Sequence, residues 1–273
     1  MRRRAFLAAL GSVACSAREP PLHFARALLS VARAAGEVTA ADERSSLSEL
    51  SRIVHLARPE LERAARGSEG VVLSELLFQR LGFVREVTDE SLSFVLLPSV
   101  LRQRRGSCVG LSTLFLTLCE SCGIPANGVL MPGHFYVRLL HGQHTRNVEL
   151  LRQGESMPDA WYEQRFPIGG NQAKEYARPL SRDETLGVVE YDIGNERRRQ
   201  LRFDEARAAF ARSIHDFPGL AEGHASLGAT LQLLGRLDEA AVSYERAHQL
   251  DSELPGVAWN RALLENERHG PAL

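Results

Sequence analysis

The sequence has few cysteines, few aromatic residues and almost no excess of either charge. Four cysteines in 273 residues are too few to build a disulfide-based extracellular domain. The formal net charge of −1 gives no long-range attraction to nucleic acid or to an anionic membrane surface. No run approaches the roughly 20 apolar residues that a membrane span needs. The remaining composition, with 44% hydrophobic and 25% charged residues, is typical of a globular chain of about two domains.

The first residues have the pattern of a targeting signal. Residues 1–4 are basic, residues 5–14 are largely apolar, and a Cys-Ser-Ala sequence follows as a small-residue cleavage site. The paired arginines also match the twin-arginine export pattern. Cys15 could instead be the lipidated cysteine of a lipoprotein signal, although Ser12 stands where such signals prefer leucine. We expect residues 1–17 to be a signal and the protein to be periplasmic or lipid-anchored, with a cytoplasmic chain as the alternative.

Cys108 lies in a segment of small residues directly before an apolar run of helical period. Gly106 and Ser107 precede it, and Gly123 ends the run. Glycine at that place is a common helix terminator, so the pattern predicts a helix that begins at or just after Cys108. Unpaired N–H groups and the helix dipole favour a thiolate at a helix N-terminus. We therefore expect a reactive cysteine.

Short strands are predicted after this helix. Residues 128–131 form a buried apolar run, and residues 134–139 alternate as a strand does. Residues 147–150 form a third short segment, in which Asn147 and Glu149 occupy alternate positions and hence one face. The pattern indicates a small sheet beside the helix.

Cysteine on a helix, histidine on one strand and an amide or carboxylate on the next is the arrangement of a Cys-His-Asx/Glx site. Cys108 would attack a carbonyl carbon and His134 would take the thiol proton. Either Asn147 or Glu149 would fix the imidazole tautomer.

The order and spacing of these segments resemble the transglutaminase-like superfamily, and more closely its SirB-like bacterial branch with TPR repeats. The resemblance is carried by LSELLFQRLGF (73–83), RRGSCVGLSTLFL (104–116), GIPANGV (123–129), LMPGHFYVRL (130–139) and NVELLRQG (147–154). It implies an α+β fold with a papain-like core, built from a helical N-terminal part and a small antiparallel sheet, over residues 18–180.

The resemblance also implies roles for the site residues. Cys108 takes the nucleophile position, His134 the base position and Glu149 the position of the acid. The acid in this branch is commonly the Asp of an Asp-Pro pair, whereas Glu149 is followed by Leu150. Asn147 is therefore the alternative to Glu149 for the third position.

A second pair of cysteines and a group of aromatic residues are further candidates for a site. Cys119 and Cys122 form a CxxC in the last turn of the predicted helix, where the dipole raises thiol pKa values, so we interpret them as packing residues, with a local disulfide as the alternative. No second ligand pair accompanies them, and we expect no metal or cofactor. An aromatic cluster follows the sheet and either packs a domain join or lines a cleft: Trp161, Tyr162, Phe166 and Tyr176.

A 34-residue repeat begins near residue 182. The first copy has Gly194, Ala206, Phe210 and Pro218, and the second has Gly228, Ala240, Tyr244 and Ser252. This period, with small residues at helix contacts, is the TPR signature, and it predicts repeats over 187–220 and 221–254 and a closing helix over 255–268. Two repeats are few for an independent solenoid, so we expect residues 181–273 to dock onto the core.

Two functions fit these features. The first is a thiol enzyme that hydrolyses or transfers the acyl group of an amide or peptide bond through Cys108, His134 and Glu149 or Asn147, with the TPR groove for a protein or peptide partner. The second is a catalytically inactive scaffold that binds a protein partner. Retention of the whole Cys-His-acid set in one chain favours the enzyme.

Overall fold

The computed structural model describes residues 21–88, 91–142, 144–169 and 174–270. The expected signal and Cys15 lie outside these ranges. Within them, no helix is both long and apolar enough to cross a membrane.

The N-terminal part is mixed helix and strand. Its helices are α1 (His23–Ala34), α2 (Ala40–Arg63), α3 (Glu69–Ser74), the π-helix η1 (Glu75–Arg80), the 3-10 helix η2 (Leu92–Phe94), α4 (Leu97–Gln103), α5 (Cys108–Cys122), the 3-10 helix η3 (Leu150–Arg152) and α6 (Asp159–Arg165). Its strands are β1 (Val84–Arg85), β2 (Arg105–Gly106), β3 (Ala126–Met131), β4 (His134–His141) and β5 (His144–Val148). This mixture agrees with the expected α+β core.

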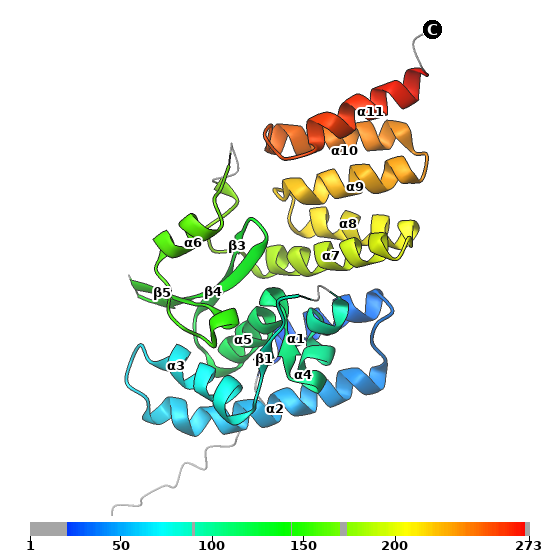
Figure 1. The fold of residues 1–273 in the computed structure, drawn as a ribbon. Helices are drawn as coiled ribbons and strands as arrows, with labels where there is room; N and C mark the ends of the chain where they lie inside the picture. Colours follow the sequence, from blue (N-terminus) through cyan, green and yellow to red (C-terminus); the bar gives the residue numbers. More distant parts are fainter. Residues whose placement is uncertain (1–20, 89–90, 143, 170–173, 271–273) are drawn as a thin grey trace, which may run out of the picture.

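The helix α5 is the centre of this part (Figure 1). Twelve of its fifteen residues are buried, because it packs against β3 and β4 on one side and α2 and α4 on others. A helix buried all round must satisfy its polar side chains internally. The hydroxyls of Thr113, Thr117 and Ser121 accordingly donate to carbonyls one turn earlier. Gly123 ends the helix in the left-handed conformation (φ +71°), as its position in the sequence predicts.

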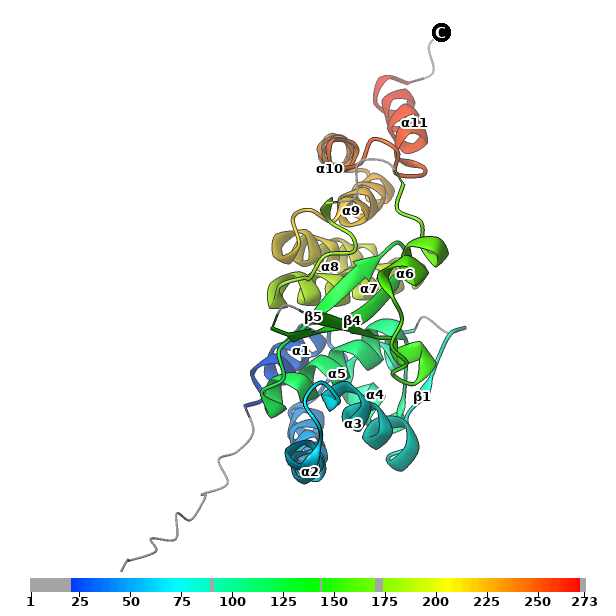
Figure 2. The same ribbon diagram turned by 90° about the vertical axis from the view of Figure 1, so that its left-hand side faces the viewer.

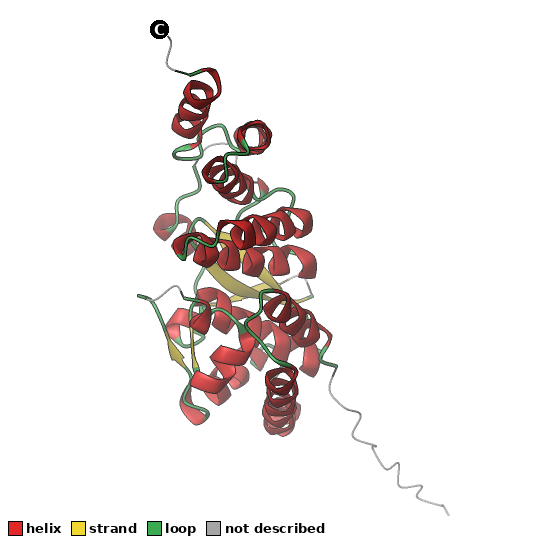
Figure 3. Cartoon of the chain, turned by 90° about the vertical axis from the view of Figure 1, so that its right-hand side faces the viewer, coloured by secondary structure: helices red, strands yellow, loops and turns green. Residues whose placement is uncertain are grey.

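The main sheet is antiparallel with the order β3-β4-β5. A tight turn at Gly133 (φ +68°) places His134 opposite Met131, and Val137 pairs with Val148 across the next strand pair. Beside it, β1 and β2 form a short parallel pair. Figures 2 and 3 show the main sheet within a mostly helical molecule, with the β1–β2 pair apart from it.

The C-terminal part is a stack of helices that rises from one side of the core (Figure 1). It contains α7 (Arg182–Arg199), α8 (Phe203–Asp216), α9 (Ala221–Leu233), α10 (Leu237–Leu250) and α11 (Val257–His269). The bounds of α8 and α10 differ by the 34 residues of the sequence repeat. Of these helices, α7 packs against α1, and Arg197 of α7 donates to the carbonyl of Ala35 at 2.8 Å.

A glycine lies at the contact between α7 and α8, and another lies at the contact between α9 and α10. Gly194 of α7 faces the buried ring of Phe210, and Gly228 of α9 faces Tyr244. A Cβ at Gly194 would lie 2.5 Å from a ring carbon of Phe210, and one at Gly228 would lie 2.8 Å from Tyr244. The same contact between a glycine and an aromatic ring therefore occurs in both copies of the repeat.

We predict that Gly194→Ala destabilises the protein by about 1–3 kcal/mol, although alanine is the better helix former, because the fully buried Phe210 ring has no space to move. Thermal unfolding of the variant measures this loss. Gly169→Ala is the matched control, since no atom lies within 4 Å of its added Cβ. A Gly194→Ala variant as stable as the control would contradict the packing described here.

Candidate active site

Cys108 is the first residue of α5, and its position is fixed on both sides. The Ser107 hydroxyl caps the helix by accepting from the Gly110 N–H at 3.2 Å, and the Ser107 N–H donates to the carbonyl of Phe94 at 2.8 Å. A Cβ at Gly110 would lie only 2.1 Å from that same carbonyl oxygen. Small residues around Cys108 are thus needed for η2 to pack closely on the start of α5.

His134 is the first residue of β4 and lies in a buried pair with Glu149. Its Nε2 is 2.7 Å from Oε2 of Glu149, and both side chains are at most 4% exposed. The other carboxylate oxygen of Glu149 accepts from the N–H of Leu151 at 2.9 Å. The ring of Phe166 stacks on the imidazole with a centroid distance of 4.3 Å and an angle of 8°. These contacts hold the imidazole in one orientation.

Asn147 belongs to a different cluster. Its carbonyl oxygen accepts from Arg138 at 2.8 Å, and its amide donates to Asp159 at 2.7 Å and to the carbonyl of Met157 at 3.1 Å. These bonds tie β5 to β4 and to the start of α6. Of the two candidates for the third site position, the structure therefore brings Glu149 to His134 and assigns Asn147 to a structural network.

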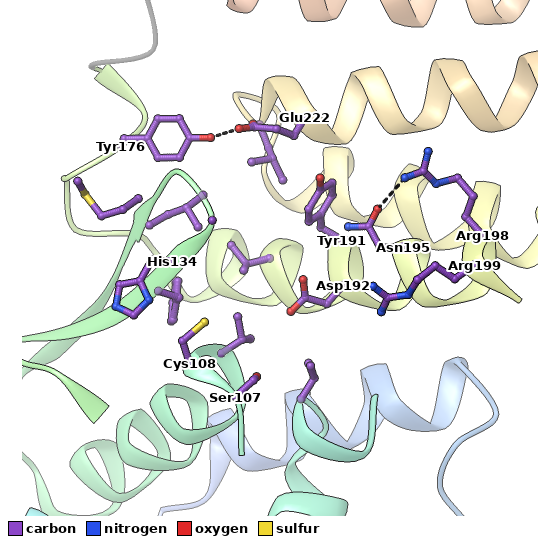
Figure 4. A pocket seen from close by; sticks show the side chains of 18 residues that line it. Ser107, Cys108, His134, Tyr176, Tyr191, Asp192, Asn195, Arg198, Arg199 and Glu222 are labelled. Atoms are coloured by element: carbon purple, nitrogen blue, oxygen red, sulfur yellow. Dashed lines mark hydrogen bonds between the residues drawn. The ribbon is translucent and has the colours of Figure 1, made fainter. Parts of the chain in front are cut away.

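The aromatic cluster divides between packing and cavity lining. Tyr162 is buried and stacks on Tyr136 at 3.7 Å, while Trp161 and Phe166 line a cavity beside His134. Tyr176 lies apart from them and donates a hydrogen bond to Glu222 of α9 (Figure 4). Both interpretations of the cluster therefore hold, each for different residues.

Two cavities meet at the cysteine and histidine. One, of about 460 Å³, lies between the core and the helices α7 and α9, and the other, of about 490 Å³, lies beside β1, η3 and α6. Both are lined by Ser107, Cys108, Gly133 and His134. Cys108 and His134 thus lie where the two cavities meet. We call these the α7 cavity and the α6 cavity.

The far wall of the α7 cavity comes from the C-terminal helices. Five side chains of α7 line this wall, namely Tyr191, Asp192, Asn195, Arg198 and Arg199, and in Figure 4 Asp192 lies on the side facing Cys108. Sequence reasoning missed all of them. The repeat pattern identifies which helix faces meet one another, but it carries no signal for which face of α7 meets the core.

The electrostatics of Cys108 differ from the sequence expectation. Burial, together with the negative charge of Asp192, raises the pKa of the thiol to about 12. Backbone N–H groups of Phe135 and Val109 act in the opposite direction by donating to the sulfur, but their effect is smaller. The helix N-terminus alone predicted a lowered pKa, and that prediction was wrong because it ignored desolvation. A proton acceptor at the sulfur is therefore needed for reactivity at neutral pH.

The other candidate groups have ordinary surroundings. Cys119 is buried, Cys122 is half-buried, and neither forms a disulfide. Burial raises the pKa of both thiols, that of Cys122 to about 11, which agrees with their interpretation as packing residues. Over the described ranges, no three His, Cys, Asp or Glu side chains are arranged to hold a metal ion.

Comparison with known proteins identifies a family from the sequence. The sequence profile of the family described as "Transglutaminase-like superfamily" matches residues 44–186. No curated protein sequence matches the chain. One similar solved structure is titled "Crystal structure of menin reveals the binding site for Mixed Lineage Leukemia (MLL) protein". It has a TM-score of 0.42 and 13% identity, over 86% of this chain and 72% of that one.

Replacement of Asp192 tests the electrostatic description of Cys108. A carboxylate near a thiol opposes thiolate formation, so Asp192→Asn is expected to lower the pKa of Cys108 and to raise its alkylation rate at a fixed alkaline pH several-fold. The rate is followed by iodoacetamide labelling, with the modified residue mapped by mass spectrometry. Asp183→Asn on the exposed first turn of α7 is the control and is expected to leave the rate unchanged. An equal rate in both variants would show that Asp192 does not act on the thiol.

Proposed function

The chain belongs to the transglutaminase-like superfamily, and we propose that it is a thiol enzyme that acts on amide bonds of a protein or peptide through Cys108, His134 and Glu149. The observation that carries the proposal is the buried 2.7 Å pair of His134 and Glu149, whose histidine lines the same two cavities as Cys108. A buried hydrogen-bonded histidine and carboxylate beside a cysteine have no packing advantage over apolar side chains, and this is the arrangement that nucleophilic catalysis needs.

In the first step, the Cys108 sulfur attacks the carbonyl carbon of the amide. Because Nε2 of His134 is bonded to Glu149, Nδ1 is the ring nitrogen that takes the thiol proton. Glu149 then stabilises the imidazolium. The C–N bond breaks, the leaving amine takes the proton from His134, and a thioester remains on Cys108.

In the second step, a nucleophile cleaves the thioester. His134 removes a proton from water or from an amine, and the attack returns the sulfur as leaving group, which regains the proton. Water gives hydrolysis and an amine gives acyl transfer. Two cavities at the same cysteine allow the acyl donor and the second nucleophile to approach from different sides.

The tetrahedral intermediates carry a negative oxygen that needs donors. The N–H of Cys108 is one of the unpaired donors of the first turn of α5, and it is the donor we assign to this oxygen. The burial that raises the thiol pKa would also strengthen this hydrogen bond, because the site has a low dielectric constant.

We further propose that α7 to α11 are TPR repeats with a role in binding. The 34-residue period, the matched bounds of α8 and α10, and the repeated glycine–aromatic contact support this assignment. Because α7 supplies a wall of the α7 cavity, the repeats would hold a protein or peptide partner directly at the cysteine.

The pH dependence of iodoacetamide alkylation at Cys108 tests the enzyme. If His134 accepts the thiol proton, the wild type is expected to react near neutral pH. In His134→Ala the only route is ionisation, which burial and Asp192 oppose, so the rate at neutral pH is expected to fall about 100-fold and to recover only at alkaline pH.

Two further variants identify the third member of the site. Glu149→Gln is expected to reduce the neutral-pH rate strongly, because glutamine does not stabilise the imidazolium. Asn147→Ala is expected to lower the unfolding temperature and to leave the rate near that of the wild type. Identical profiles for the wild type and His134→Ala would reject the enzyme and favour a scaffold that binds its partner through the helical repeats.

A further inference from the structure

We propose that the α6 cavity is an anion subsite, which binds a carboxylate of the peptide substrate next to the attacked bond. This inference rests on the proposed function for the identity of the attacked bond. The cavity contacts Cys108 and His134 on one side and carries three arginines on the other, Arg85, Arg152 and Arg165.

Two of these arginines have no carboxylate partner in the part of the chain that the structure describes. Arg85 donates to the carbonyl of Leu151 at 2.9 Å, which leaves its positive charge uncompensated. Arg165 lies over the ring of Trp161, with its guanidinium carbon 5.9 Å from the ring centroid. That contact orients the guanidinium without neutralising it. Arg152, in contrast, is paired with Glu155 at 2.6 Å.

The acidic side chains of the cavity are already engaged. Glu86 is bonded to Arg105 at 2.9 Å and accepts from the N–H of Thr88 at 2.8 Å. Glu149 is bonded to His134. The charge that the cavity offers to a ligand is therefore positive. Guanidinium groups bind carboxylates with two parallel hydrogen bonds, so a carboxylate is the complementary group.

The apolar walls place this carboxylate relative to the cysteine. Phe166 stacks on His134, and Trp161 makes an edge contact with Phe166 at 6.2 Å between ring centroids. An aromatic surface therefore runs from the base to Arg165, and a peptide lying on it would bring its acidic group to the arginines. The α7 cavity is different, because it presents both signs of charge through Asp192, Glu222, Arg198 and Arg199.

The first experiment compares alkylation of Cys108 by iodoacetate and by iodoacetamide, which have similar size and differ in charge. An anion subsite beside the sulfur is expected to raise the ratio of the iodoacetate rate to the iodoacetamide rate in the wild type. The Arg85→Gln/Arg165→Gln double variant is expected to lower this ratio roughly five- to tenfold at low salt. Arg44→Gln/Arg66→Gln is the matched control, because both arginines are exposed and neither lines this cavity.

The outcomes separate this inference from the proposed function. A wild type that reacts with iodoacetamide but has the same charge preference as the double variant rejects the subsite and leaves the thiol enzyme standing. A cysteine that reacts with neither reagent rejects the enzyme, and the subsite is then decided by direct binding.

The direct measurement uses the fluorescence of Trp161 in a Trp259→Phe background, which removes the other tryptophan of the chain. The probes are the peptides acetyl-Ala-Glu-Ala-amide, acetyl-Ala-Gln-Ala-amide and acetyl-Ala-Ala with a free carboxyl end. Tighter binding of the glutamate peptide than of the glutamine peptide indicates recognition of an acidic side chain. Tighter binding of the free-ended peptide indicates recognition of a chain terminus.

Either preference, lost in the arginine double variant and kept in the matched control, supports the subsite. Equal binding of all three peptides, or a preference that survives loss of both arginines, overturns it.

Discussion

Burial of α5 on every side is the constraint on which the rest of the structure depends. The helix fills the space between the sheet and the N-terminal helices, so its axis and its first residue are fixed by packing. Because Cys108 is the first residue of α5, it is held in place at the edge of the sheet where β4 begins. The turn at Gly133 then brings His134 to the same edge, and no flexible segment is required to assemble the pair.

The same burial imposes a chemical cost. It removes water from the thiol and raises its pKa, and the docking of α7 adds the charge of Asp192 in the same direction. A helix dipole is too weak to offset these two effects. In the mechanism that we propose, the buried carboxylate of Glu149 stabilises the imidazolium that forms when His134 takes the proton. In this account the C-terminal helices are part of the site and tune its cysteine.

Local signals made much of the core predictable from sequence. Gly123 and the small residues before Cys108 mark the two ends of α5, and the alternation after Pro132-Gly133 marks β4. The residues that end a helix and the alternation of a strand are both set by neighbouring residues in the sequence. The family resemblance agreed with them, and the family profile matches residues 44–186.

The choice between Asn147 and Glu149 depends on a longer-range feature. Alternation places both on one face of a strand, but β5 ends at Val148, and Glu149 instead starts η3 and accepts from the N–H of Leu151. Its N–H also donates to the carbonyl of Glu155. Asn147 meanwhile pairs across the sheet with Arg138. The residues that form the walls of the α7 cavity could not be predicted from the sequence for a related reason, because they depend on how α7 packs against the core.

Trapping of an acyl-enzyme shows directly whether Cys108 is a nucleophile that His134 activates. The protein would be mixed with p-nitrophenyl acetate, quenched in acid, and analysed by intact mass and peptide mapping. We predict one acetyl group on Cys108, removed by hydroxylamine as a thioester is, and strongly reduced in both His134→Ala and Glu149→Gln. Acetylation that spares Cys108, or that is equally fast in the wild type and His134→Ala, would show that Cys108 is not a nucleophile activated by His134.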